Sequence, residues 1–139
     1  MNELRFEVMP IGWVQSPLTD PALAPKQGDE GAPDACLVFE SNVLEGLEGL
    51  RAGDEVIVVT WLHRARRDVL RVHPRGDPSR PQRGVFSTRS PHRPNPIGLH
   101  PVVVLSIDRD RVRVRNLEAV DGTPIVDVKS TLSSDISER

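Results

Sequence analysis

Residues 97–117 read IGLHPVVVLSIDRDRVRVRNL and decide the fold class. Two apolar runs, 97–107 and 111–117, flank the polar turn Asp108-Arg109-Asp110, an arrangement typical of a β-hairpin. In the second run valine alternates with arginine, which predicts one face packed on a core and one charged face in water. The stretch therefore indicates an antiparallel β-sheet protein.

Outside this hairpin the apolar segments are short, and proline, glycine and aspartate separate them. The β-branched run over 55–62 is typical of a strand buried on both sides, and the spacing of valine and leucine predicts one short helix over 42–50. With no βαβ alternation, these elements predict an all-β barrel or sandwich with long loops. The further strands are expected over residues 6–14, 35–40, 55–62, 69–72 and 125–128.

A chain of 139 residues is about one domain, and we expect a β domain over 1–132 with a polar C-terminal tail over 133–139. The single cysteine, Cys36, excludes an intramolecular disulfide, and its apolar neighbours predict a buried small hydrophobe rather than a nucleophile. The first residues lack the apolar stretch of a signal peptide, and no run is long enough to span a membrane. A cytoplasmic protein with no membrane partner is expected.

The formal net charge of −2 conceals a strong asymmetry along the chain. Residues 1–62 carry 3 basic and 11 acidic groups, whereas residues 63–93 carry 9 basic and 2 acidic groups. All nine basic groups are arginines, which bind phosphate and carboxylate through paired N–H bonds, so nucleic acid is the expected partner. The alternative is that Arg64, Arg66 and Arg67 form a solvated face paired with the acidic first segment.

Within the arginine-rich segment, residues 83–99 read RGVFSTRSPHRPNPIGL. Three prolines lack a backbone donor, fix their own φ and push the preceding residues into extended conformations, which predicts a stiff loop. A stiff loop loses little entropy when a ligand binds, and it presents its polar side chains in a fixed array. The side chains concerned are Arg89, His92, Arg93 and Asn95. Such an array suits an anionic or carboxylate-bearing ligand.

Several common functional sites find little support in the sequence. The four histidines lack the paired spacing of zinc ligands, so we expect no metal. Ser87 or Ser90 near His92 could belong to a hydrolytic triad, but neither lies in a nucleophile elbow. A dinucleotide fingerprint and a P-loop are both absent, so a nucleotide-like cofactor would bind outside the usual folds.

Three motifs connect the sequence with a known family. The loop sequence over 84–98 closely resembles the signature of the TsaA-like family, also called TrmO. IGWVQSP at 11–17, followed by PKQ at 25–27, is similar to the family's N-terminal motif, and DGTPIVDVK at 121–129 is similar to its C-terminal motif. The three motifs follow the family's order across almost the whole chain.

This resemblance implies a mainly antiparallel β-barrel that binds S-adenosylmethionine without a Rossmann domain and forms a homodimer. It implies a methyltransferase acting on tRNA or a related nucleotide-like substrate. The best known members perform N6-methylation of threonylcarbamoyladenosine beside the anticodon. The implied cofactor contacts are Pro25, Lys26, Gln27, His63, Arg64, Arg89, Leu99, Arg115, Asn116, Leu117 and Glu118.

Methyl transfer from a sulfonium donor mainly requires alignment of donor and acceptor, which a stiff loop can provide. Glu118 or Asp121 could attract the cationic donor or accept a proton from the acceptor. The structural alternatives are turn formation for Asp121, an ion pair for Arg89 and loop-internal hydrogen bonding for Asn95. The expected catalytic residues are Arg89, Asn95 and Asp121, and the expected substrate-binding residues are His92, Arg93 and Asn95.

A second function from another class stays open, namely a non-catalytic RNA-binding β-barrel that uses its arginines for phosphate. Such a module would bind RNA with a steep salt dependence whether or not the cofactor is present. Two Trp, three Phe and no Tyr offer few aromatic platforms for unpaired bases. This scarcity favours the enzyme.

Overall fold

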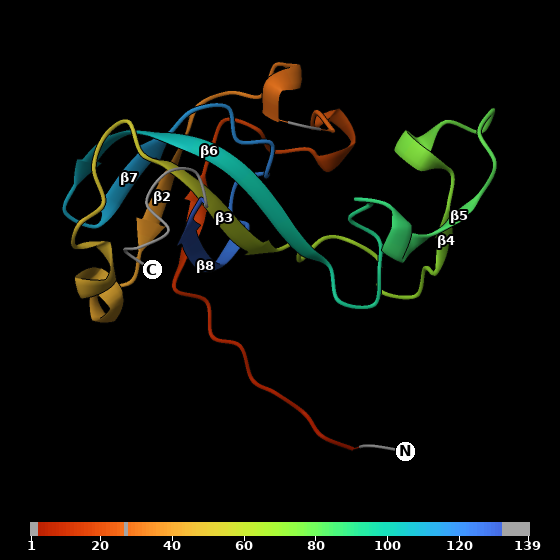
Figure 1. The fold of residues 1–139 in the computed structure, drawn as a ribbon, viewed down its shortest axis with the longest axis horizontal. Coiled ribbons are helices and arrows are strands. Elements are labelled where there is room, and N and C mark those ends of the chain that lie inside the picture. Colours follow the sequence, from red (N-terminus) through yellow and green to blue (C-terminus); the bar gives the residue numbers. More distant parts are fainter. Residues whose placement is uncertain (1–2, 27, 132–139) are drawn as a thin grey trace.

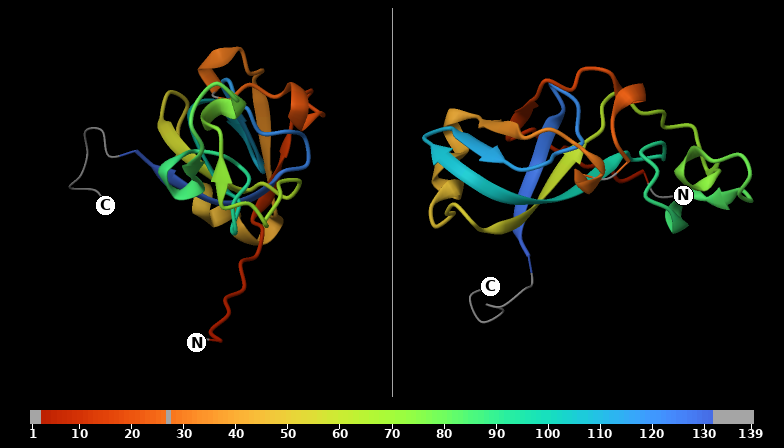
Figure 2. Two further views of the ribbon diagram at one scale, coloured as in Figure 1. Left: turned by 90° about the vertical axis from the view of Figure 1, so that its right-hand side faces the viewer. Right: turned by 90° about the horizontal axis from the view of Figure 1, so that it is seen from above.

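The computed structural model describes residues 3–26 and 28–131, which form a closed barrel of six antiparallel strands (Figures 1 and 2). The predicted all-β class, mainly an antiparallel β-barrel with long loops, is confirmed. The barrel strands are β1 (Gly12–Gln15), β2 (Ala35–Phe39), β3 (Glu55–Trp61), β6 (Ile97–Asp108), β7 (Arg111–Val114) and β8 (Pro124–Ser130). A separate two-stranded sheet pairs β4 (Arg71–Val72) with β5 (Arg83–Gly84).

The barrel closes in the order β1-β2-β7-β6-β3-β8, with β8 returning to β1. At the closing seam the Ile11 amide donates to the Ile125 carbonyl at 2.8 Å. Strand β3 pairs along its whole length with β6, from Glu55 opposite Val103 to Trp61 opposite Ile97. The twelve-residue β6 therefore continues from the barrel towards the proline-rich loop, which it places at one end of the barrel (Figure 1).

The core fills the interior of the barrel with small and medium apolar side chains. Val112 and Val114 are fully buried between exposed arginines, so the predicted alternation in the hairpin is confirmed. The other apolar side chains of this core that are at most 2% exposed are Val14, Leu37, Val56, Val58, Val104, Leu117 and Ile125. Burial of this apolar surface is the main force that closes the barrel.

The predicted strand over 6–14 is wrong in its first half. The strand begins at Gly12, and the preceding residues extend away from the barrel (Figure 1). Phe6 is 81% exposed and Val8 is 59% exposed. Pro10 has no amide hydrogen for a ladder bond, so pairing along this strand stops at Ile11.

The short helix predicted over 42–50 is present, but it is a 3-10 helix, η3 (Ser41–Leu47). Val43, Leu44, Leu47 and Leu50 pack against the core as their spacing predicted. Gly49, at φ 91°, bends the chain in a conformation that other residues rarely adopt. Single 3-10 turns occur at η1 (Pro21–Leu23), η2 (Gly28–Glu30), η4 (Pro74–Gly76) and η5 (Val85–Ser87). None of the helices in the described part of the chain could cross a membrane.

Two expectations about burial need correction. Strand β3 is buried on one side only, because Ile57, Val59 and Trp61 face outwards and are half-buried. Cys36 is half-buried rather than buried, because it lies on the outward side of β2 between the inward-facing Ala35 and Leu37.

The predicted runs 69–72 and 111–117 are shorter strands than expected. The first is the two-residue β4, and the second ends at Val114, since Asn116 has a φ of 52° that interrupts an extended strand. The predicted C-terminal tail over 133–139 lies outside the described residues.

We expect a Gly12→Ala variant to lower the free energy of unfolding by at least about 2 kcal/mol. A methyl group at this position would lie 2.2 Å from the carbonyl oxygen of Val38, so β1 and β2 would have to separate. Gly46→Ala is the matched control, because a methyl group there meets nothing within 4 Å. Urea denaturation measures both; equal stability of the two variants would contradict the prediction.

Candidate functional site

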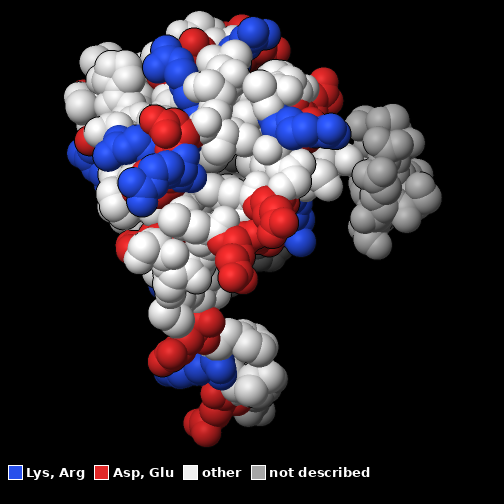
Figure 3. All heavy atoms as spheres, turned by 90° about the vertical axis from the view of Figure 1, so that its left-hand side faces the viewer, with Lys and Arg blue, Asp and Glu red and all other residues white. Residues whose placement is uncertain are grey.

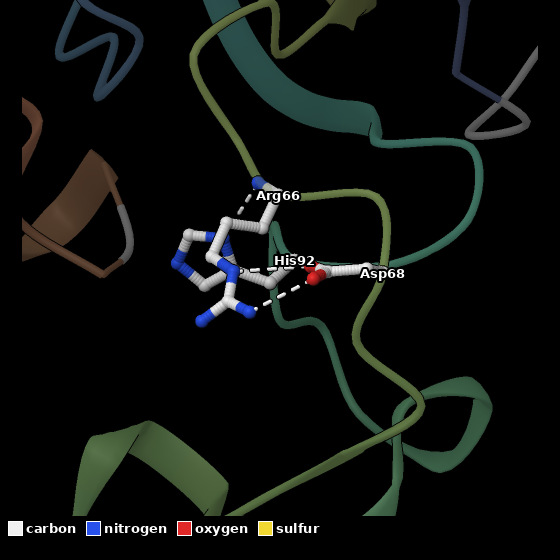
Figure 4. A network of polar contacts seen from close by, with 3 residues as sticks. All are labelled: Arg66, Asp68 and His92. Carbon is white, nitrogen blue, oxygen red and sulfur yellow. Dashed lines mark hydrogen bonds and ion pairs between the residues drawn. The ribbon is translucent and has the colours of Figure 1, made fainter.

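The proline-rich loop, defined here as residues 85–96, is fixed to the segment that follows β3. The Leu62 amide donates to the Pro96 carbonyl at 2.8 Å, and the Arg93 amide donates to the Arg66 carbonyl at 3.1 Å. The Arg66 amide donates to Nδ1 of His92 at 3.0 Å (Figure 4). Because Nδ1 accepts this bond, the proton of a neutral His92 ring is on Nε2.

Arg67 connects the same two segments through its side chain. Its Nε donates to the Pro94 carbonyl at 2.6 Å, and its Nη2 donates to Oδ1 of Asn95 at 2.9 Å. The guanidinium carbon lies 5.1 Å from the ring centroid of Trp61, which is a cation–π distance. The Arg67 side chain therefore restrains the loop in addition to the restraint that its prolines provide.

We expect Arg67→Lys to loosen the loop with little effect on global stability, because lysine cannot form the two-pronged contact. Amide exchange at Arg93, whose N–H donates across the two segments, should accelerate about tenfold, the effect of losing a hydrogen bond of about 1.4 kcal/mol. Arg113→Lys on the exposed face of β7 is the control. Unchanged exchange at Arg93 in Arg67→Lys would contradict this role.

Two other arginines near the loop are also engaged within the protein. The Arg66 guanidinium contacts both carboxylate oxygens of Asp68 at 3.0 Å (Figure 4), and this hydrogen bond, aided by the positive charge, lowers the pKa of Asp68 below its ordinary value. Nη2 of Arg93 donates to the carbonyls of Val85 and Thr88. Arg66 and Arg93 therefore already have partners on the protein.

Arg89 and Arg64 are exposed. Arg89 makes a long contact of 3.4 Å with the Leu99 carbonyl, and Nη1 of Arg64 donates to the Thr19 carbonyl at 2.9 Å. His63 is exposed in the turn after β3. Leu99 is 46% exposed and lies on the outward side of β6, where it is paired with Val59.

A pocket of about 360 Å³ lies further along β6. Two segments that are distant in the sequence meet there, η2 and the segment after β7. The pocket is lined by residues from η2, β3, β6, the segment after β7 and the residue that follows β8. They are Gly28, Asp29, Glu55, Val56, Pro101, Val102, Val103, Arg115, Asn116, Glu118 and Thr131. Three of the predicted cofactor contacts, Arg115, Asn116 and Glu118, are among them.

Gly28 shows how closely the two segments approach. A side chain at this position would place its first carbon 2.3 Å from the Asn116 carbonyl oxygen and 3.2 Å from Oε2 of Glu118. The Leu117 amide also donates to the Pro33 carbonyl at 3.0 Å. The PKQ motif, which ends one residue before Gly28, therefore leads directly to the pocket, although Gln27 itself lies outside the described residues.

The structure places the remaining predicted residues in two other locations. The Oδ1 atom of Asp121 accepts a hydrogen bond from the Ser16 amide at 2.9 Å, which joins the N-terminal and C-terminal motifs. The side chain of Asn95 accepts a hydrogen bond from Arg67 in the segment after β3, so this contact is made between two segments and not within the loop. Arg89, His92, Arg93 and Asn95 all belong to the proline-rich loop, whereas Asp121 lies in the turn before β8.

A buried polar network beside the pocket escaped prediction. His100 is 3% exposed and lies between Thr60 and Glu118. Its Nε2 is 2.7 Å from Oγ1 of Thr60, and its Nδ1 is 2.6 Å from Oε1 of Glu118. The one sequence signal is a histidine at an inward position of β6, in register with Gly98, Val102 and Val104. Among the described residues no group of three metal-ligating side chains occurs.

The end of the barrel opposite the proline-rich loop carries charges of both signs. On the face that includes the β6–β7 turn, basic and acidic side chains are intermixed (Figure 3). Arg111 there lies 3.9 Å from Asp110, and Arg113 lies 3.8 Å from Asp34. The excess of arginine therefore belongs to residues 63–93, at the end with the proline-rich loop.

Comparison with known proteins agrees with these features. The family described as the tRNA-methyltransferase O N-terminal domain, TrmO_N, matches residues 13–134. The chain belongs to the TrmO family. This match confirms the resemblance expected from the three motifs.

Relatives of the TrmO-family chain extend over nearly its whole length. A probable S-adenosyl-L-methionine-binding protein of Methanothermobacter thermautotrophicus is 41% identical over 129 residues, covering 93% of this chain and 92% of the relative. An S-adenosyl-L-methionine-binding protein of Archaeoglobus fulgidus is 42% identical over 120 residues, covering 86% of this chain and 85% of the relative.

The fold is similar to that of solved TrmO proteins. The crystal structure of TrmO from Pseudomonas aeruginosa matches with a TM-score of 0.76 and 28% sequence identity. The match covers 94% of this chain, which spans 58% of that protein's length.

Proposed function

We propose that this TrmO-family protein is an S-adenosylmethionine-dependent methyltransferase that acts on tRNA. The observation that carries the proposal is the convergence at one pocket of Gly28 and Asp29, which directly follow the PKQ motif, with residues from the 115–118 segment. These segments are almost ninety residues apart in the sequence, yet Gly28 lies in contact with Asn116 and Glu118. The names of the two archaeal relatives support S-adenosylmethionine as the ligand.

The chemistry of the pocket fits this cofactor. Asp29, Glu55 and Glu118 place three carboxylates around it, and Arg115 supplies one positive charge. S-adenosylmethionine carries two positive groups, the sulfonium and the amino group, and one carboxylate. The carboxylates would attract the positive groups, and Arg115 would bind the carboxylate through paired hydrogen bonds.

The cofactor, when bound, supplies a methyl group on a positively charged sulfur. The protein's residues then have to bind, align and shield the two reactants. On the outward side of β6, Pro101 lines the pocket and Leu99 lies between it and the proline-rich loop, so a ligand could lie along the strand. Arg89 and the loop would hold the acceptor. As the new N–C bond forms, the methyl C–S bond of the donor would break to release the neutral thioether, and the acceptor nitrogen would lose its proton to a carboxylate such as Asp121 or to water.

For the substrate, we propose tRNA, with N6-methylation of threonylcarbamoyladenosine as the specific reaction. The arginine-rich residues 63–93 would contact phosphates, and Arg89 would contact the carboxylate of the modified base. The family name supports a tRNA substrate. A tRNA substrate and the single free cysteine support a cytoplasmic location.

Two measurements test the proposal. Isothermal titration should show S-adenosylmethionine binding to the protein, and incubation with labelled cofactor and tRNA carrying threonylcarbamoyladenosine should yield the methylated nucleoside by mass spectrometry. Cofactor binding without methylation would reject the specific substrate. RNA binding that falls steeply with salt, with no binding of the cofactor, would instead favour the RNA-binding module.

We further propose that the protein acts as a homodimer. Large apolar side chains remain exposed on one copy, among them Phe6 at 81%, Met9 at 74% and Ile97 at 46%. A second copy of the chain could cover such side chains. Light scattering should give twice the 15.4 kDa mass of the chain, and a mass of one chain at micromolar concentration would reject the dimer.

A further inference from the structure

We propose that His100 is a positioning residue that fixes the Glu118 carboxylate at the edge of the pocket, with Thr60 securing the imidazole ring from the other side. The inference rests on the proposed function, because it assigns to this network the orientation of a cofactor-binding carboxylate. The two contacts, 2.7 Å to Thr60 and 2.6 Å to Glu118, form a continuous buried chain from β3 through β6 to the segment after β7.

For a neutral imidazole ring, the donors and acceptors of this chain match in one arrangement. A carboxylate can only accept, so Nδ1 of His100 donates its N–H to Oε1 of Glu118. In a neutral ring Nε2 is then an acceptor, and the Thr60 hydroxyl donates to it. Thr60 is fully buried and its side chain lies among packed neighbours, so the ring has partners at both nitrogens and little freedom to turn.

The space that the ring and the Thr60 hydroxyl share exists because residue 98 has no side chain. A side chain on Gly98 would place its first carbon 2.6 Å from Oγ1 of Thr60 and 2.7 Å from Nε2 of His100. Gly98 therefore permits the contact between Thr60 and His100, and it holds this place because it is paired with Thr60 across β3 and β6. This explains the glycine in the IGL sequence after the loop.

The second oxygen of Glu118, Oε2, lies on the side of Gly28, which lines the pocket. Oε2 lies 3.2 Å from the point where a Gly28 side chain would begin, and among the described residues only Oε1 accepts a hydrogen bond. Oε2 can then accept from a ligand without moving. If His100 did not hold Oε1, the Glu118 carboxylate could turn towards Arg115, which lines the same pocket. The two side chains would then form an ion pair with each other, and neither charge would be available to a ligand.

The test compares variants of His100 that differ in their donors. His100→Leu removes both ring nitrogens, whereas His100→Asn retains an N–H near the position of Nδ1. We expect His100→Leu to weaken S-adenosylmethionine binding by about 10-fold to 100-fold, the effect of losing a hydrogen bond to a charged group, and His100→Asn to restore most of the affinity. Val104→Ala, a buried change on β6 outside the pocket, controls for loss of packing and should leave the affinity unchanged.

A double-mutant cycle that combines the His100 variants with Glu118→Ala, and measures cofactor affinity, shows whether His100 acts by positioning Glu118 or only by supporting the fold. If His100 acts through Glu118, His100→Leu should cost little further affinity once Glu118 is alanine. Additive losses, or equal affinities of His100→Leu and His100→Asn, would overturn the inference. Should His100→Leu not fold, Thr60→Val, which removes the hydroxyl that secures the ring, takes its place in the cycle and must be non-additive with Glu118→Ala. If the wild type binds no S-adenosylmethionine, the proposed function itself fails.

Discussion

A Gly28→Ala variant is expected to bind S-adenosylmethionine about 100-fold more weakly than the wild type, a loss of about 2.7 kcal/mol. The added methyl group would lie 2.3 Å from the Asn116 carbonyl oxygen and would separate the PKQ segment from residues 115–118. Isothermal titration measures the affinity. The global stability should change little, because η2 lies outside the barrel and contains no buried residue.

Gly46→Ala is the control for this experiment, since it adds the same methyl group in open space on η3. Its affinity should equal that of the wild type. A Gly28→Ala protein that remains folded and binds the cofactor normally would show that contact between these two segments is not needed for the site.

Arg89→Ala should lower kcat/KM for tRNA methylation by at least about 100-fold while the protein stays as stable as the wild type. Arg89 is exposed, and its contact with the Leu99 carbonyl is long, at 3.4 Å, so its guanidinium is available for a ligand. A charge-assisted contact to substrate or cofactor would be lost with the side chain. Initial rates with labelled cofactor measure the effect.

Arg93→Ala is the informative comparison, because the guanidinium of Arg93 already binds the carbonyls of Val85 and Thr88. This variant should loosen the loop, with faster amide exchange over residues 85–88, and reduce activity through that loss. If Arg89→Ala retained full activity and Arg93→Ala did not, the ligand-binding role would have to be moved from Arg89 to Arg93.

The strands of the barrel were predictable where a local pattern coincides with the final packing. Residues 97–107 form a mainly apolar run and residues 111–115 alternate valine with arginine. The structure pairs these two runs as a hairpin that turns at Arg109. The strand predicted over residues 6–10 is absent because an alternating pattern says nothing of a partner strand, and Pro10 has no amide hydrogen for pairing. Burial of β3 was overestimated, because β-branched residues fill strands whether their second face is covered or not.

For the candidate site, sequence indicated the loop and the motifs but not their connections. The stiffness of the loop was predictable from its prolines, whereas Arg67 and Trp61, which secure it, are separated from Asn95 by about thirty residues of chain. Thr60, His100 and Glu118 come from three separate segments and meet only once the barrel closes. A network of this kind has no local signature.

The central claim is that the outward side of β6, from the proline-rich loop to the pocket at Glu118, binds S-adenosylmethionine. A crystal structure of the protein with S-adenosylhomocysteine tests it most directly. We predict that the ligand lies along Leu99 and Pro101, within hydrogen-bond distance of Glu118 and of the backbone at 115–117. A ligand bound on another face of the barrel, or no ligand at saturating concentration, would contradict the claim.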